Sequence, residues 1–188
     1  MTRSALAAIF PLVLLAACKP PATDEYVERV DLEDTGSFAS EGAPSPDTTG
    51  AGWAMSRTEG RIIYGKPGDT PLVALECTGK PGAAMIRMTR FAAADREAQA
   101  LAALVGNRMV ARIPVDAVPS GRAWIWQGSI SADNAGLDAL LDPVSIELTV
   151  PGAGTTVLNP SPLPLDLLAG CRALNGPPAA PATPASGP

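Results

Sequence analysis

The clearest pattern along this chain is an alternation of apolar and polar residues within short segments. It is plainest in residues 144–150, where the apolar positions are Val144, Ile146, Leu148 and Val150. A period of two is typical of a strand with one face in the core and the other in solvent. The same pattern predicts strands over residues 72–77, 85–90, 107–114 and 122–130.

In each predicted strand the apolar positions share one face, which we expect to point toward the core. These positions are Val73, Leu75 and Cys77, Ile86 and Met88, Met109, Ala111 and Ile113, and Trp124, Trp126 and Ile130. Five arginines fall on predicted outer faces or at strand ends, namely Arg87, Arg90, Arg108, Arg112 and Arg122. We expect them to be solvated, with a weak groove for an anionic ligand as the alternative.

Glycine and proline mark the turns between these segments. Pro67-Gly68 and Pro81-Gly82 fit the two central positions of a type II turn, and residues 151–154 supply a third turn. No helix of suitable pattern follows any of them, and the chain has no G-x-G-x-x-G or Gly-Lys-Ser/Thr motif. We therefore interpret these segments as turns and not as phosphate-binding loops.

Helices are expected to be few and short. Residues 95–105 are rich in Ala, Glu, Gln and Leu, with Asp95 as an N-cap and Gly106-Asn107 as a stop. Residues 134–141 and 163–169 predict two more, the second ended by Gly170. The predicted fold is mainly β: a small antiparallel sandwich or barrel with one to three short helices.

The first 18 residues follow a different pattern. Arg3 precedes an uncharged apolar run that ends in Leu15-Ala16-Ala17-Cys18. The run is shorter than the roughly 20 apolar residues that span a bilayer. It resembles the lipobox of bacterial lipoproteins, in which cleavage leaves a lipidated N-terminal cysteine. The alternatives are an ordinary secretory signal cut nearby and a buried helix.

The resemblance implies a diacylglyceryl group on the Cys18 sulfur and a further acyl chain on its amine. Two or more acyl chains anchor a protein stably, whereas one binds only marginally. Lys19 stands where an Asp favours inner-membrane retention, so the resemblance implies the outer membrane, with the domain facing the periplasm or the cell surface. It covers residues 1–18 alone and implies nothing about the domain that follows.

Charge and composition divide the rest of the chain. Residues 19–50 carry eight carboxylates against Lys19 and Arg29, which predicts an acidic disordered linker. A docking segment for a cationic partner is the alternative. We predict a signal peptide over 1–17, a lipidated N-terminus and linker over 18–52, a β domain over 53–172 and a Pro/Ala-rich tail over 173–188. The domain is close to neutral, so no nucleic-acid partner is expected.

Two cysteines remain once Cys18 is assigned to lipid. In an exported chain Cys77 and Cys171 are expected to form a disulfide that joins the last helix to the sheet, with two buried thiols as the alternative. The chain has no histidine, which removes Ser-His-Asp and Cys-His catalysis and every zinc site with a histidine ligand. We expect no metal, no cofactor and no enzymatic activity.

Two groups of side chains remain as candidates for function. Trp124 and Trp126 share a strand face and are either core residues or the lining of a ligand or partner surface. Asp133, Asp138 and Asp142 are either caps and solvated charges or catalytic carboxylates. We expect a membrane-anchored, non-catalytic binding or scaffold module with an envelope protein as partner. The alternatives are a periplasmic inhibitor or small-ligand-binding lipoprotein, and a carboxylate-dependent hydrolase.

Overall fold

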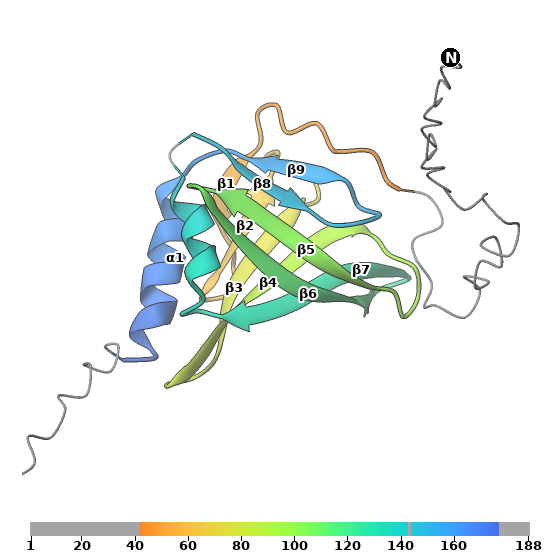
Figure 1. Cartoon of the computed structure of the whole chain (residues 1–188). Helices are drawn as coiled ribbons and strands as arrows, with labels where there is room; N and C mark the ends of the chain where they lie inside the picture. The colour runs from red at the N-terminus through yellow and green to blue at the C-terminus, as the bar shows by residue number, and fades with distance from the viewer. Residues whose placement is uncertain (1–41, 143, 177–188) are drawn as a thin grey trace, which may run out of the picture. The chain divides into compact units, whose positions relative to one another are not determined.

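The computed structural model describes residues 42–142 and 144–176. In these residues nine strands form one antiparallel sheet that curls into a nearly closed barrel (Figure 1). The strands are β1 (Gly52–Met55), β2 (Arg61–Gly65), β3 (Val73–Lys80), β4 (Ala83–Ala93), β5 (Gln99–Gly106), β6 (Met109–Ser120), β7 (Ala123–Ser131), β8 (Ile146–Thr149) and β9 (Thr155–Leu158). The predicted fold class is confirmed, and of the two expected architectures the barrel is the one formed.

Two helices accompany the sheet, the 3-10 helix η3 (Ala135–Leu141) and the α-helix α1 (Pro162–Ala173). They lie together at one end of the barrel (Figure 1). The strand order is β1-β2-β3-β4-β7-β6-β5-β8-β9, so β4 pairs with β7 and the β5–β6–β7 meander runs back beside it. This order leaves β1 and β9 as the two edges of the sheet.

The interior of the barrel is filled by the apolar faces that the alternation predicted. Val73, Leu75, Ile86, Met88, Ala111, Ile113 and Trp126 are all buried there. The predicted turns are confirmed as well, because Gly68 and Gly82 have φ angles of 87° and 83°, as the third residue of a type II turn requires. The period of two therefore identified the inward side of most of the central strands.

The helix predicted over residues 95–105 is wrong, because most of this segment is strand β5. Its partners run along β6 from Gln99 opposite Asp116 to Gly106 opposite Met109. The two-residue loop between them, Asn107 and Arg108, has positive φ at both positions, which is the geometry of a type I′ hairpin turn. Burial of alternate side chains in the barrel outweighs the helix propensity of this alanine-rich segment.

The other two helix predictions are confirmed, with small shifts at three of the four boundaries. Residues 135–141 form η3, and α1 continues past Gly170 to Ala173. Ser161 caps α1, since its hydroxyl accepts a hydrogen bond from the backbone N–H of Leu163 at 3.3 Å. The buried positions Pro164, Leu168 and Cys171 recur at helical spacing, so one face of α1 packs against the barrel.

The predicted disulfide between Cys77 and Cys171 is confirmed. It joins β3 to α1 across 94 residues of sequence, with the two Cα atoms 5.6 Å apart. Closing so long a loop stabilises the folded state by about 4–5 kcal/mol in the chain-entropy model. The side chain of Arg172, the next residue of α1, also donates to the backbone carbonyl of Ala132 at 2.9 Å. The end of α1 is thus fixed to the sheet on two sides.

Side chains, and not a backbone ladder, join the two edges of the sheet. The buried Tyr64 hydroxyl donates to the carbonyl of Val157 at 3.0 Å and accepts from the N–H of Asn159 at 3.1 Å. The Asn159 side-chain amide donates to the carbonyl of Ala51 at 2.8 Å, and Trp53 Nε1 donates to the Asn159 carbonyl at 3.1 Å. We call this group of contacts the seam.

Residues before β1 also bind the β8–β9 hairpin. Ala43 donates its N–H to the carbonyl of Gly152 at 2.8 Å, and the Ser45 hydroxyl accepts from the N–H of Thr155 at 3.0 Å. Both residues belong to the stretch that the sequence assigned to the linker. The barrel therefore makes contacts with the chain several residues before its first strand.

Replacing Tyr64 with Phe tests how much the seam contributes. The ring stays in the core, but the backbone groups of Val157 and Asn159 lose their shared partner. We expect the free energy of unfolding, measured by urea titration, to fall by about 1–3 kcal/mol. Trp53→Phe removes a more exposed seam bond and should cost less. Equal losses in the two variants would contradict a special role for the Tyr64 hydroxyl.

Candidate functional site

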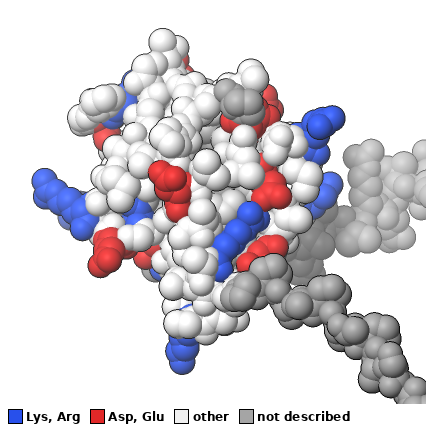
Figure 2. Space-filling model, turned by 90° about the vertical axis from the view of Figure 1, so that its left-hand side faces the viewer, with Lys and Arg blue, Asp and Glu red and all other residues white. Residues whose placement is uncertain are grey.

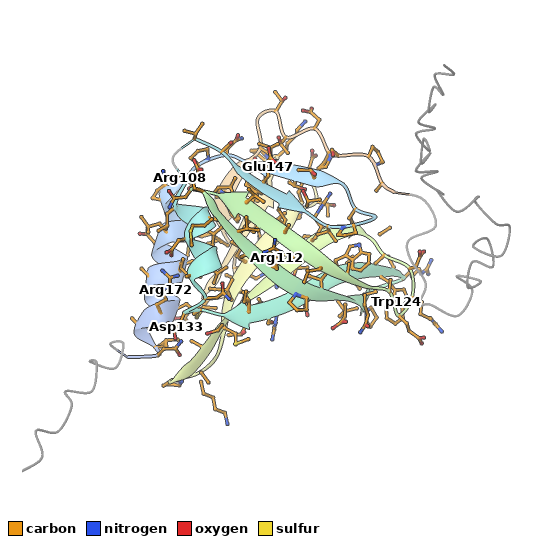
Figure 3. The ribbon with its side chains drawn as sticks, in the orientation of Figure 1. Arg108, Arg112, Trp124, Asp133, Glu147 and Arg172 are labelled. Carbon is orange, nitrogen blue, oxygen red and sulfur yellow. A yellow bond between two sulfur atoms is a disulfide. The ribbon has the colours of Figure 1, made fainter. Side chains whose placement is uncertain are left out.

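The two tryptophans singled out by the sequence lie on the same face of β7 but in different surroundings. Trp126 is 1% exposed and belongs to the core. Trp124 is half-buried at the end of the barrel away from α1 (Figure 3), with the Arg96 guanidinium 5.5 Å from its ring centroid. The core interpretation is confirmed for Trp126, so the pair does not form an exposed stripe. Cys18 lies outside the described residues.

The three candidate carboxylates hold loops and helix ends in place. Asp142 accepts hydrogen bonds from the backbone N–H groups of Asn107 and Val144. Asp138 pairs with Arg172 at 2.9 Å, and Asp133 accepts from the side-chain amide of Asn175 at 2.6 Å. No group of three or more His, Cys, Asp or Glu residues in the described ranges is placed to hold a metal ion.

The sequence placed Arg90 on the outer face of its strand, and this is wrong. Its side chain is 3% exposed and points into the barrel, whereas Arg108, Arg112 and Arg122 are exposed and Arg87 is half-buried. In an alternating strand, position 90 shares a face with Ile86 and Met88. The alternation of the strand by itself predicts an inward side chain at position 90. The outward assignment relied on the charge of the arginine.

The buried Arg90 guanidinium is held by backbone carbonyl groups. Nη1 donates to the carbonyl of Leu72 at 3.1 Å, and Nη2 donates to the carbonyl of Ala153 at 3.2 Å. Burial lowers the pKa of Arg90. No carboxylate in the described part of the chain pairs with it. Arg90 therefore links the β2–β3 loop to the β8–β9 turn from inside the barrel.

The most distinctive surface is the outer side of four adjacent strands, β6, β5, β8 and β9. We call it the β5 face, and it comprises Leu101, Ala103, Val105, Val110, Arg112, Pro114, Glu147, Thr149, Thr155 and Val157. Four of these are large apolar side chains that remain 38–50% exposed: Leu101, Val105, Val110 and Val157. Neither helix lies over this face (Figure 1).

Two opposite charges lie on the β5 face, one on each side of its central strand. Arg112 stands on β6 opposite Ala103, and Glu147 stands on β8 opposite Val105 (Figure 3). Both are exposed, and no ion pair joins them in the described structure. The face thus presents exposed apolar side chains interspersed with one cation and one anion, and it is bordered on β5 and β6 by the hydrogen-bonded pair Gln99 and Asp116.

A signal for this face is present in the sequence of β5. Residues 100–105 read Ala-Leu-Ala-Ala-Leu-Val, so both sides of the strand are apolar. One side fills the barrel, where Ala102 and Leu104 are buried, and the other side is the β5 face. A strand with one face in solvent normally alternates, so a continuous apolar run in such a barrel indicates a second buried or binding surface. The signal is missed when this segment is interpreted as a helix, because the two faces of a strand are then not considered.

Several hollows lie elsewhere on the described residues. One of about 370 Å³ is lined by residues of β1, of β2 and of the loop that follows β2, among them Trp53 and Pro67. Two others, of about 540 and 320 Å³, flank the first half of α1 near Leu165 and Leu163. The end of the barrel beside α1 carries basic and acidic side chains mixed among uncharged ones (Figure 2). No single sign of charge dominates that view.

Comparison of the chain with protein-family models, curated proteins and solved structures finds no match. Neither helix in residues 42–142 and 144–176 is long and apolar enough to cross a membrane.

Acid titration tests the structural role of Asp142. Hydrogen bonds from the N–H groups of Asn107 and then Val144 lower the pKa of its carboxyl from 3.8. The ionised carboxylate therefore stabilises the folded state fully at pH values above the pKa that this carboxyl has in the unfolded chain. The stabilisation is lost as the pH falls through the lower pKa of the folded state.

We expect Asp142→Asn to flatten the fall in unfolding free energy as the pH is lowered below about 4, measured by urea titration at each pH. Asp166→Asn, at an exposed position of α1, is the control and should keep the wild-type slope. A wild-type slope in Asp142→Asn would show that these hydrogen bonds do not depend on the charge.

Proposed function

We propose that this protein is a lipid-anchored, non-catalytic binding module of the bacterial envelope that docks another envelope protein through the β5 face. The observation that carries the proposal is the uncovered group of exposed apolar side chains on β5, β6 and β9. The anchor rests on the resemblance of Leu15-Ala16-Ala17-Cys18 to a lipobox. The disulfide between Cys77 and Cys171 is in keeping with an oxidising compartment.

The packing of the barrel supports an external binding surface. The largest interior side chains, including Tyr64, Met88 and Trp126, are fully buried and fill the space between the strands. Small barrels filled in this way have a core where larger ones have a ligand cavity. A drug-sized ligand has no room inside, so recognition of a large partner falls to the outer surface.

The chemistry of the β5 face suits a protein partner. Several large apolar side chains exposed side by side on one face of a folded domain are typical of protein–protein contacts. Glu147 lies between Val105 and Val157, and Arg112 lies opposite Ala103, so both charges are within the face. Charges in an interface set the orientation of the partner and the rate of encounter. A membrane anchor would add to this by holding the module at high local concentration near other envelope proteins.

The anchor is tested by Cys18→Ser. We expect this variant to accumulate as a precursor that retains residues 1–17 and carries no acyl mass, because the sulfur is the acceptor of the diacylglyceryl group. Intact-protein mass spectrometry of membrane and soluble fractions measures this. The control, Cys77→Ser with Cys171→Ser, should keep the lipid. Normal lipidation of Cys18→Ser would overturn the anchor.

The docking surface is tested by site-specific photocrosslinking in intact cells. A benzophenone amino acid at Leu101 should capture one envelope protein of defined mass. The same amino acid at Leu165 on α1 is a matched control, because the two leucines are 50% and 47% exposed. Adding Val105→Glu should abolish the Leu101 adduct, since it puts a charge in the apolar contact.

Three results would overturn the docking proposal. Equal capture at Leu101 and Leu165 would mean that the contact is nonspecific. Absence of any adduct at Leu101 would mean that the β5 face is free in the cell. An adduct of twice the mass of the chain would assign the face to self-association in place of a separate partner.

A further inference from the structure

Three side chains inside the barrel each have a buried polar atom without a hydrogen-bond partner in the described structure. The atoms are Arg90 Nε, Trp126 Nε1 and Thr156 Oγ1. The three residues are 3%, 1% and 0% exposed. Buried polar groups without partners are uncommon and costly, and a bound ion or water is a frequent explanation.

Strand register places the first two of these residues side by side. Arg90 on β4 lies directly opposite Trp126 on β7, and both side chains point inward. Directly opposite residues of antiparallel strands have Cβ atoms about 4.5–5.5 Å apart. Thr156 lies on the inner side of β9, three residues after Ala153, whose carbonyl accepts from Arg90 Nη2. All three side chains are buried, and Arg90 contacts the β8–β9 turn directly.

Two of the three unpartnered groups are donors only. The Arg90 Nε–H and the Trp126 indole N–H donate and do not accept, whereas the Thr156 hydroxyl both donates and accepts. A water molecule needs acceptors for its own two hydrogens, and among these groups only the Thr156 hydroxyl provides one. An anion accepts from every direction and donates nothing, so it matches the two N–H donors better.

The charge of the cluster leads to the same conclusion. An arginine remains protonated in proteins, and an isolated buried charge is strongly unfavourable unless it is compensated. The carbonyl groups of Leu72 and Ala153 provide dipoles to Arg90, but no carboxylate of the described residues provides a countercharge. A bound anion would supply it.

The space limits the size of the ligand. Tyr64, Val73 and Met88, which line the same interior, are fully buried. Arg90 lines none of the three surface hollows described above. We propose that the barrel interior binds a monovalent anion of halide size, between Arg90 Nε and Trp126 Nε1. This site is separate from the β5 face and does not depend on the proposed docking function.

The test measures thermal unfolding of the full chain, purified in non-ionic detergent without halide. Sodium gluconate, too bulky to enter, is exchanged for sodium bromide at constant sodium concentration. We expect Tm to rise with the logarithm of the bromide concentration above the dissociation constant, by about 4–7 °C at ten times that constant. Crystals soaked in bromide should show an anomalous peak between Arg90 and Trp126.

Two variants identify the donors. Trp126→Phe keeps a ring in the core but removes the indole N–H, so the bromide-dependent rise in Tm should be reduced or lost. Trp124→Phe makes the same change two residues away on the same face of β7 and should keep the wild-type rise. Arg90→Met removes the charge, and its Tm should be the same in bromide and gluconate.

The proposal fails if the wild-type Tm is equal in bromide and gluconate. It also fails if Trp126→Phe and Trp124→Phe keep equal responses, because the effect would then come from the surface. An anomalous peak only on the outside of the barrel would likewise overturn it, whatever the thermal result.

Discussion

The structure depends on how the two edges of one long sheet are brought together. An open sheet edge carries unpaired N–H and carbonyl groups that favour association with other chains. Here β1 and β9 do not pair through a ladder, and the buried Tyr64 hydroxyl bonds both the Val157 carbonyl and the Asn159 N–H in place of a neighbouring strand. With the seam closed, the inward faces of nine strands share one interior.

Closure separates the roles of the inside and the outside. The interior is packed with large apolar side chains, so it has little room for a large ligand. Arg90 is a charged side chain in this apolar interior. Its guanidinium connects the β2–β3 loop to the β8–β9 turn at the cost of a buried charge. The outer side of β5 and its neighbours keeps an apolar surface that the fold itself does not use. Arg90 and the β5 face are thus the two departures from a simple barrel with an apolar inside and a polar outside.

Particular residues show which parts of the fold the sequence pattern predicts correctly. The alternation in β3, β4, β6 and β7 correctly identified inward residues such as Leu75, Ile113 and Trp126, because a period of two depends only on the pleat of the strand. It failed at Arg90, where the same parity pointed inward but the charge suggested solvent. It also failed at β5, because the propensity of an alanine-rich segment is a weak local effect that pairing with β6 and β8 overrides.

The sequence by itself determined the class of fold, the inward side of most central strands, the turns and the disulfide partners. These features follow from local periodicity, from turn residues and from the small number of cysteines. Only the tertiary structure decided that the sheet closes through Tyr64, that Arg90 has no countercharge among the described residues, and that Leu101 and Val105 share an open face with Val157. Each of these depends on which strands become neighbours, and that choice is made by packing between residues far apart in the chain.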